Sequence, residues 1–259
     1  MRVFIVASDE PIFLVPYLRR VIEQCRPFIV GVGVHTPAPK TIRLRRIFAL
    51  GLLALLMLSP RHWARLLYLK WRDGLAWLGI RPTDHHLADV CRDAGVPVRA
   101  VVSVNAEGFA QHLLEQRIDV LLHQTSEILR GPVLSAPAIA VVNRHMSLLP
   151  AYRGAWPIFW QVANGESEVG ISLHIVDEGI DSGTVVVQEA IRRQRRESMS
   201  ALLGRLFERS VPLTCMAFET LRTGRPVPKP APSGPVYKTP TAAQILRYLF
   251  TPRRETLGA

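Results

Sequence analysis

Short apolar runs alternate with helical patterns of hydrophobic residues along most of the chain. Val3 to Ala7 is the first such run, and polar residues bound it. Runs of this kind are typical of strands buried on both faces. We expect strands over 3–7, 28–34, 96–101, 118–123, 138–143, 170–176 and 184–190, and helices over 16–24, 85–94, 106–116, 158–164 and 198–223. The alternation predicts an α/β fold with a mostly parallel, doubly wound sheet and helices on both faces.

An apolar and basic segment, from about 40 to 80, interrupts this alternation. Ile47 to Pro60 carries no charge, and as a helix it would extend roughly 21 Å, less than the ~30 Å hydrocarbon core of a bilayer. We therefore do not expect it to cross a membrane. The residues that follow place an apolar face opposite a basic one, as in interfacial helices. That face comprises Trp63, Leu66, Leu67, Trp71, Leu75 and Leu78.

Two interpretations of the 40–80 segment stay open. It is either a helical insertion that packs on the sheet or on a second subunit, as in a homodimer, or a segment that contacts a membrane surface or a lipid-linked acceptor. Further along, we expect a solvated basic connector at 192–196. The proline-rich stretch RPVPKPAPSGPVYKTPT predicts an extended tail without a core. We thus divide the chain into a main domain, 1–190, and a carboxy-terminal helix with an extended tail, 191–259.

Composition and charge narrow the possible classes of protein. Hydrophobic residues make up 48% of the chain, enough for a full core. Cys25, Cys91 and Cys215 are far apart and form no CxxC pair, so we expect reduced, buried thiols in a cytosolic protein, with neither a disulfide nor a metal site. The first residues do not resemble a signal peptide. A net charge of +11 indicates an anionic partner, unless it only reflects an arginine-rich proteome.

The stretch VVNRHMSLLPAYRG places an amide and an imidazole where a predicted strand ends. Asn143 and His145 are two residues apart, so on an extended backbone they project to the same side. Ligands of doubly wound sheets bind beyond the carboxyl ends of the strands. Asp181 lies in a later loop, DEGIDSG, whose glycines permit tight turns. We expect these three side chains to converge on one site.

Such a trio suits acyl transfer to an amine. The Asn143 amide and a protonated His145 would donate hydrogen bonds to the oxyanion of a tetrahedral intermediate. Asp181 would raise the pKa of the histidine and help relay the proton that the amine loses. No serine or cysteine nucleophile is needed, because the incoming amine is itself the nucleophile.

The stretch NRHMSLLPAYRGAWPIFWQVANGESEVGISLHIVDEGIDSG strongly resembles the folate-dependent formyltransferases. That family acts on glycinamide ribonucleotide, methionyl-tRNA and amino sugars, and shares an Asn-x-His, a Ser-Leu-Leu-Pro and an Asp-x-Gly loop. The resemblance covers roughly residues 85–190 well. It implies a Rossmann-like formyltransferase fold, 10-formyltetrahydrofolate as formyl donor, no metal, and catalytic roles for Asn143, His145 and Asp181.

The resemblance also implies binding residues on both sides of that trio. The folate-binding residues would be His123, Gln124, Ile128, Leu129, Asp177, Glu178, Gly179 and Ile180, and the acceptor-binding residues Ser147, Arg153 and Trp156. For His123 and Glu127, ordinary loop polarity is an equal alternative. His174, inside its strand, favours a structural role over a catalytic one.

Departures from the family pattern bear on the acceptor. The loop ASDEP lacks the glycine-rich phosphate loop that glycinamide-ribonucleotide enzymes carry after their first strand. The residues after Ala190 are fewer than those of the carboxy-terminal barrel of methionyl-tRNA enzymes, so we expect tRNA to be a poor candidate. The chain begins directly with the catalytic fold, so we do not expect the amino-terminal domain of formyltetrahydrofolate hydrolases either. We therefore expect an anionic amine, that of a nucleotide-linked or lipid-linked amino sugar, and a cytoplasmic enzyme, with the inner face of the membrane as a possible site. The alternatives are a methionyl-tRNA formyltransferase-like enzyme, a hydrolase and a non-catalytic folate binder.

Overall fold

The computed structural model describes residues 1–37, 44–74, 86–224 and 234–250. Both ends of the apolar and basic segment, with Leu75 and Leu78, lie outside the described residues. So does the first half of the proline-rich tail.

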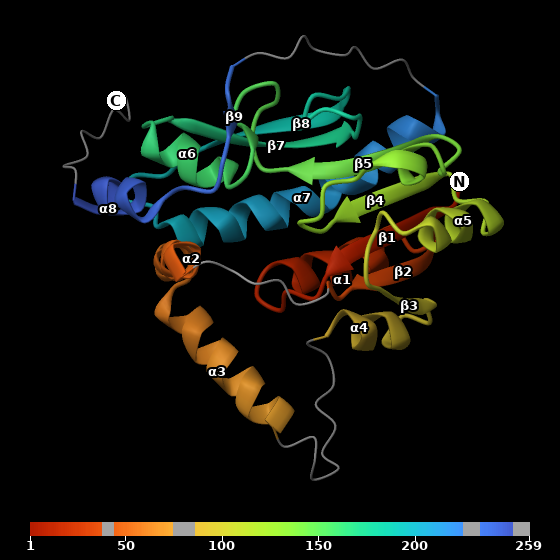
Figure 1. The fold of residues 1–259 in the computed structure, drawn as a ribbon, viewed down its shortest axis with the longest axis horizontal. Helices are drawn as coiled ribbons and strands as arrows, with labels where there is room; N and C mark the ends of the chain where they lie inside the picture. Colours follow the sequence, from red (N-terminus) through yellow and green to blue (C-terminus); the bar gives the residue numbers. More distant parts are fainter. Residues whose placement is uncertain (38–43, 75–85, 225–233, 251–259) are drawn as a thin grey trace.

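A seven-stranded sheet forms the centre of the fold, in the order β3-β2-β1-β4-β5-β7-β8 (Figure 1). Neighbours from β3 to β5 pair in parallel, whereas β7 pairs antiparallel with both β5 and β8. The strands are β1 (Val3–Ser8), β2 (Ile29–His35), β3 (Val98–Val101), β4 (Val120–Gln124), β5 (Ala140–His145), β7 (Glu168–Ile175) and β8 (Val185–Arg192). The predicted mostly parallel sheet is confirmed.

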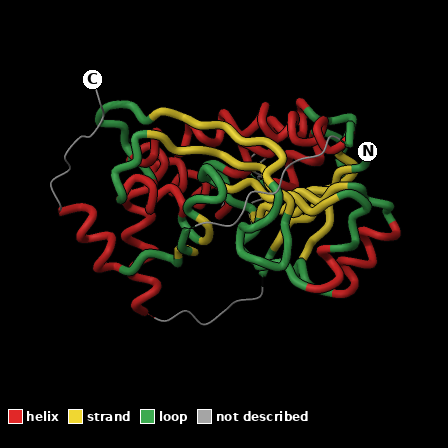
Figure 2. Tube along the Cα trace, turned by 90° about the horizontal axis from the view of Figure 1, so that it is seen from above, coloured by secondary structure: helices red, strands yellow, loops and turns green. Residues whose placement is uncertain are grey.

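Helices cover both faces of this sheet (Figure 2). One core cluster joins α1 and α7 to one face of the strands, and a second joins α5 and the 3₁₀ helix η2 to the other. Before the carboxy-terminal segment, the described helices outside the insertion are α1 (Leu14–Gln24), α4 (Leu87–Asp93), α5 (Glu107–Glu115), η2 (Gly131–Leu134), α6 (Pro157–Ala163) and α7 (Met199–Arg222). Apolar side chains thus bury both sides of β1, β4 and β5, whose sequences lack polar alternation until their carboxyl ends.

The carboxy-terminal segment is not the extended, coreless tail that its prolines predicted. Strand β9 (Val236–Tyr237) pairs with β6 (Arg153–Gly154), and helix α8 (Ala242–Phe250) follows. Ile245 of α8 is fully buried. The expectation was wrong because the apolar period of AAQILRYLF lies just beyond Pro240 and forms an amphipathic helix.

The insertion forms two helices, α2 (Leu44–Met57) and α3 (Pro60–Gly74). Helix α2 packs against α7 and α8 through Ala49, Leu53 and Met57. Helix α3 turns away from α2 by 115° and extends from the body of the fold (Figure 1). Within the described residues no single helix is long and apolar enough to span a membrane, although the bent α2–α3 pair passes that test by length and composition.

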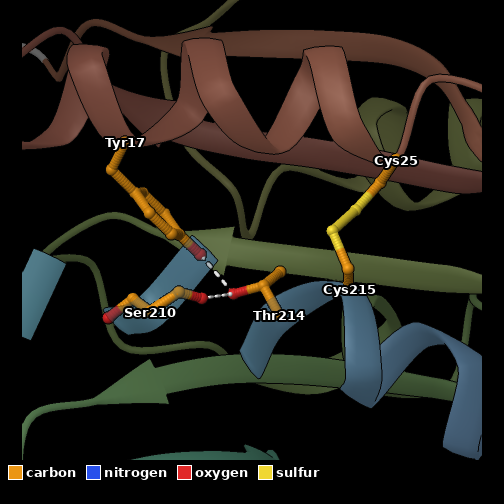
Figure 3. Close-up of a disulfide and its surroundings, with 5 residues drawn as sticks. All are labelled: Tyr17, Cys25, Ser210, Thr214 and Cys215. Atoms are coloured by element: carbon orange, nitrogen blue, oxygen red, sulfur yellow. Dashed lines mark hydrogen bonds between the residues drawn. A yellow bond between two sulfur atoms is a disulfide. The ribbon is translucent and has the colours of Figure 1, made fainter. Parts of the chain in front are cut away.

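The expectation of three reduced thiols was wrong. Cys25, which caps the carboxyl end of α1, forms a disulfide with Cys215 of α7, across a sequence separation of 190 (Figure 3). Cys91 is free and buried. Spacing could not reveal the pair, because the packing of α1 on α7 alone brings the two Cα atoms to 6.0 Å.

Candidate active site

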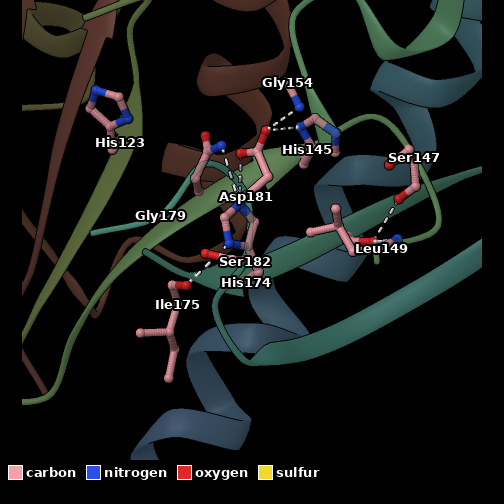
Figure 4. A network of polar contacts seen from close by, with 12 residues as sticks. His123, His145, Ser147, Leu149, Gly154, His174, Ile175, Gly179, Asp181 and Ser182 are labelled. Atoms are coloured by element: carbon pink, nitrogen blue, oxygen red, sulfur yellow. Dashed lines mark hydrogen bonds and ion pairs between the residues drawn. The ribbon is translucent and has the colours of Figure 1, made fainter. Parts of the chain in front are cut away.

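The three expected catalytic side chains lie together. Asn143 and His145 are at the carboxyl end of β5, and Asp181 is in the loop between β7 and β8. The Oδ2 atom of Asp181 lies 3.5 Å from Nδ1 of His145, and its Oδ1 atom lies 3.5 Å from Nε2 of His174 (Figure 4). His174 is the antiparallel partner of Asn143 on β7, and its Nε2 is 3.4 Å from the Asn143 amide nitrogen.

Asp181 is held as an anion. The backbone N–H of Gly154 donates to its Oδ2 atom at 2.8 Å. Burial alone would raise the pKa of this carboxyl, but the interactions with His174 and His145 and the hydrogen bond from the Gly154 N–H together lower it to about 2. Asp181 therefore remains a carboxylate throughout the physiological pH range.

Two glycines allow the backbone to close around this carboxylate. A Cβ on Gly183 would lie 1.7 Å from the carbonyl oxygen of Ile175, and one on Gly154 would lie 2.2 Å from that of Tyr237. Gly154 also adopts a left-handed φ of 96°. These positions accept only glycine without displacing a neighbour. Asp181 itself has a positive φ of 45°, a conformation that costs free energy for a non-glycine residue and recurs at functional sites.

His145 is buried, and both its nitrogens have defined neighbours. The Nε2–H donates to the carbonyl oxygen of Tyr152 at 2.9 Å, so in the neutral ring Nδ1 carries the lone pair that faces Asp181. The pKa of His145 is lowered, because burial outweighs the opposing charge of Asp181. The expected raised pKa and protonated imidazole are thus corrected: burial keeps the ring neutral near pH 7.

His174 belongs to the same cluster, although its position inside a strand favoured a purely structural role. Its Nδ1–H donates to the Ile175 carbonyl at 3.1 Å, which leaves Nε2 to face Asn143 and Asp181. The sequence alone could not place His174 in the cluster, because only the antiparallel pairing of β7 with β5 brings it opposite Asn143.

The expected folate-binding residues at the end of β4 and in the loop after it divide into buried and exposed positions. His123 is buried, its Nε2 lies 2.9 Å from the Thr125 hydroxyl, and burial with the nearby His35 lowers its pKa to about 4. Gln124 is buried too, and its side chain points toward β5 rather than outward. Leu129 is buried, whereas Ile128 is exposed and available to a ligand.

Glu127, for which a role in the site and ordinary loop polarity were equal alternatives, binds the loop after β4 to neighbouring elements. Its carboxylate accepts hydrogen bonds from His35, Ser103 and the Val104 N–H at 2.7–3.0 Å. Burial would raise its pKa, but these donors lower it. Glu127 thus holds the 125–130 loop in place from inside.

The second expected folate segment, 177–180, is a turn beside the cluster. The Asp177 carboxylate accepts from the Gly179 N–H at 3.1 Å and from the Ser182 hydroxyl at 2.7 Å, which shapes the turn. Glu178, Gly179 and Ile180 are exposed. Their exposure makes the surface of this turn and the Ile180 side chain accessible to a ligand.

The expected acceptor-binding residues differ in accessibility. Ser147 is fully buried and its hydroxyl donates to the Ala151 carbonyl, so it stabilises the SLLP turn and offers no exposed atom to an acceptor. Arg153 is partly exposed and donates to the Gly234 carbonyl at 3.1 Å. Trp156, partly exposed, precedes α6 with a left-handed φ of 58°. Arg153 and Trp156 thus remain accessible beside Gly154, whose N–H contacts Asp181.

This cluster joins a donor amide, a neutral imidazole and a carboxylate of low pKa within a few ångströms. The amide can stabilise an oxyanion, and the imidazole with the carboxylate can accept a proton. No side chain in the cluster is a serine or cysteine nucleophile within the described residues, so a nucleophile would come from a bound molecule.

Comparison with known proteins agrees with this chemistry. Residues 87–213 match the Formyl transferase family. The methionyl-tRNA formyltransferase of Synechococcus sp. (strain JA-3-3Ab) is 38% identical over 104 residues, 40% of this chain and 32% of the relative. The chain thus spans about a third of that curated relative.

Solved structures show the same fold. Glycinamide ribonucleotide transformylase 1 from Symbiobacterium toebii superposes with a TM-score of 0.61 at 17% identity, covering 87% of this chain and 89% of that one. A sugar N-formyltransferase from Shewanella sp. FDAARGOS_354 gives 0.55 at 12% identity, covering 92% and 76%. Residues 87–213, just under half of the chain, are thus similar to a formyl transferase domain, which agrees with the resemblance of the motif to the folate-dependent formyltransferases.

Proposed function

We propose that this protein transfers a formyl group from 10-formyltetrahydrofolate to a primary amine. The observation that supports this most is the convergence of Asn143, His145 and Asp181 at the end of β5. The amine nitrogen attacks the formyl carbon and forms a tetrahedral intermediate with an oxyanion. The bond between that carbon and N10 of the folate then breaks, and N10 takes up the proton that the amine has lost.

The geometry suits a defined role for each side chain. The Asn143 Nδ2 donates to the oxyanion. The Nδ1 of neutral His145 lies 3.5 Å from the Oδ2 of Asp181, and both atoms are acceptors. A proton that leaves the amine is therefore stabilised between them. That proton is then available to N10 as the tetrahydrofolate leaves. The exposed Ile128 and Ile180 would contact the folate ring, beside the backbone of the 177–180 turn.

For the acceptor, we propose the amine of a nucleotide-linked or lipid-linked amino sugar. The loop after β1 disfavours a phosphate at the start of α1, because Glu10 already occupies that helix end. Its carboxylate accepts from the N–H groups of Ile12, Phe13 and Leu14 at 2.6, 2.9 and 2.8 Å. A phosphate would have to displace this anion from the donors it would itself need.

The insertion supports a lipid-linked carrier. The helices α2, α3 and α8 carry exposed apolar side chains, which we propose act together as one α2–α3–α8 surface: Phe48, Leu55, Leu67, Tyr68, Trp71 and Phe250. Between Leu44 and Gly74 the basic residues outnumber the single acidic one, Asp73. Aromatic and apolar groups bordered by cations favour an anionic membrane surface. We propose that this surface rests on such a membrane at its cytoplasmic face.

A second candidate acceptor is an aminoacyl-tRNA. The curated relative described above is a methionyl-tRNA formyltransferase, and the net charge of +11 would attract a nucleic acid. A turnover assay separates the candidates. Purified protein is incubated with 10-formyltetrahydrofolate and with nucleotide-linked amino sugars, lipid-linked amino sugars, methionyl-tRNA or no acceptor.

The mass of the acceptor and the release of tetrahydrofolate are both followed. We expect formyl addition to an amino sugar and no release without it. Formylated methionyl-tRNA would instead identify the second candidate. Release without any acceptor would indicate a hydrolase, and folate binding without turnover a non-catalytic binder.

Flotation with vesicles tests the α2–α3–α8 surface. We expect the protein to rise with phosphatidylserine vesicles at low salt and less so at high salt, and not with phosphatidylcholine vesicles. Replacing Leu67 and Trp71 with Ser should abolish flotation, whereas Leu114→Ser, an exposed leucine on α5, serves as the matched control. Absence of flotation at low salt, or concentration-dependent dimerisation that Leu67→Ser and Trp71→Ser remove, would contradict membrane docking.

A further inference from the structure

Arg144 stands between the two motif residues Asn143 and His145, yet the proposed chemistry gives it no role. Its guanidinium lies on the other side of β5, over the rings of both Tyr17 and Phe207, at 4.6 and 4.2 Å from their centroids. The hydroxyl of Tyr17 is in turn fixed on Thr214 of α7 at 2.7 Å (Figure 3). Two aromatic faces therefore hold a planar cation directly behind the site.

The guanidinium determines the orientation of a neighbouring amide. Arg144 Nε lies 3.0 Å from Oε1 of Gln124 on β4. A guanidinium has only donors, so the Gln124 atom that faces it must be the oxygen. The Gln124 Nε2 also lies 2.6 Å from the His123 carbonyl oxygen, which can only accept. Two independent neighbours thus require the same orientation of Gln124.

The orientation of the Gln124 amide in turn determines that of the Asn143 amide. The Gln124 Nε2 lies 3.3 Å from Oδ1 of Asn143, and a donor at this place requires the oxygen of Asn143 to face it. The Asn143 Nδ2 is consequently directed to the other side, toward His174 and the cluster around Asp181. An asparagine amide has nearly the same shape in both orientations, so shape alone does not select one.

We propose that Arg144 and Gln124 are positioning residues that orient the Asn143 amide so that its NH2 group faces the reacting centre. With the amide reversed, Oδ1 would face the developing oxyanion and repel it, so the orientation decides whether Asn143 stabilises or destabilises the intermediate. This inference rests on the proposed formyl transfer for its kinetic consequence, but the orientation itself is a property of the unliganded protein.

Gln124→Glu is the most direct test. A carboxylate keeps the size of the side chain and still accepts from Arg144, but it offers Asn143 an acceptor where Gln124 offers a donor. Asn143 should then turn its NH2 toward Glu and its oxygen toward the centre. We expect kcat to fall by about 10²-fold, as when an oxyanion donor is lost, with little change in KM for the folate. Arg144→Met removes one of the two constraints on Gln124 and should cause a smaller loss, which Arg144→Lys partly restores.

A double-mutant cycle separates positioning from general damage. In an Asn143→Ala background, Gln124→Glu should have almost no further effect on kcat. An equal loss in both backgrounds, or no loss in the wild-type background, would overturn the proposal. The thermal midpoints of all variants are compared to monitor folding.

An NMR measurement that does not require turnover tests the orientation of Asn143 independently of the proposed formyl transfer. The side-chain NH2 signals of Asn143 in a ¹H–¹⁵N spectrum, assigned by their loss in Asn143→Ala, should shift in Gln124→Glu and less in Arg144→Met. Shifted signals in a protein that formylates no amine would refute the proposed function and leave the orientation supported. Unshifted signals would refute the orientation whatever the activity.

Discussion

The imidazole of His145 is fixed between the Tyr152 carbonyl, 2.9 Å from Nε2, and the Asp181 carboxylate, 3.5 Å from Nδ1. The carbonyl selects the tautomer with hydrogen on Nε2, and the carboxylate defines where a proton on Nδ1 would be stabilised. Burial keeps the neutral ring as the resting state, since it lowers the pKa of His145 despite the adjacent charge. The pair is thus arranged to gain a proton during the reaction.

Asp181→Asn should therefore slow turnover without preventing binding. The amide has no charge to stabilise the imidazolium, and its NH2 can donate to the Nδ1 lone pair and block it. We expect kcat to fall by about 10²-fold or more with KM for the folate little changed. Steady-state rates with the acceptor found by the turnover assay measure this. Glu219→Gln, an exposed carboxylate on α7, is the control, and equal rates in both variants would contradict the role of Asp181.

The pH dependence follows from the lowered pKa of His145. The active form needs a neutral ring, so kcat/KM should stay level as the pH falls past ~6.5, the ordinary value, and decline only below it. Removal of Asp181 removes a charge that raises this pKa, so in Asp181→Asn it should fall further. An NMR titration of the His145 ring in both proteins measures the two values. A His145 pKa above ~6.5 in the wild type would contradict the assignment.

Much of the fold follows from local patterns. The apolar runs that became β1, β4 and β5 are buried on both faces, so their composition alone identifies parallel strands. Helix α8 was missed because a proline-rich stretch precedes it, and the disulfide because it depends on the packing of α1 against α7. Helix α8 carries a local amphipathic period that the preceding prolines obscured, whereas the disulfide depends on a contact between segments far apart in the chain, which no local pattern encodes.

The site, like the fold, could be predicted from the sequence only in part. Asn143 and His145 could be paired from their spacing, and the family pattern supplied Asp181. The membership of His174 in this cluster depends on the register between β5 and β7. The lowered pKa of His145 depends on burial, which reverses the direction expected from the charge of Asp181 alone. Neither register nor depth of burial could be obtained from the motif.

Gly183→Ala should disturb the site through the backbone. The added methyl would meet the Ile175 carbonyl at 1.7 Å and force the loop that carries Asp181 to shift. A misplacement of about 1 Å can cost on the order of 10²-fold in rate, so we expect a large loss in kcat in a folded protein. Gly204→Ala in α7, where a Cβ meets nothing within 4 Å, should leave kcat unchanged and stabilise the helix by roughly 0.5–1 kcal/mol. Normal kcat in Gly183→Ala would show that the loop adapts without moving Asp181.

His123 should make the protein sensitive to acid. Its folded-state pKa of about 4 lies below the ordinary ~6.5, so the unfolded chain binds the proton first. The free energy of unfolding should then fall as the pH drops from ~6.5 toward 4, by up to ~1.4 kcal/mol per pH unit from this residue. Urea midpoints at pH 7 and pH 5 should differ less in His123→Gln than in the wild type. Equal differences would place the acid sensitivity elsewhere.

The disulfide between Cys25 and Cys215 should raise the free energy of unfolding, because it closes a long loop of the chain. It joins α1 to α7 across a separation of 190 residues and so restricts the unfolded chain more than a short loop would. We expect Cys25→Ser with Cys215→Ser to lower the free energy of unfolding by about 2–4 kcal/mol. Reductant should lower the urea midpoint of the wild type toward that of the double variant, and Cys91, present in both proteins, controls for effects on a free thiol. If reductant leaves the wild-type midpoint unchanged while a thiol count finds three free cysteines in the unfolded chain, the bond does not form in solution.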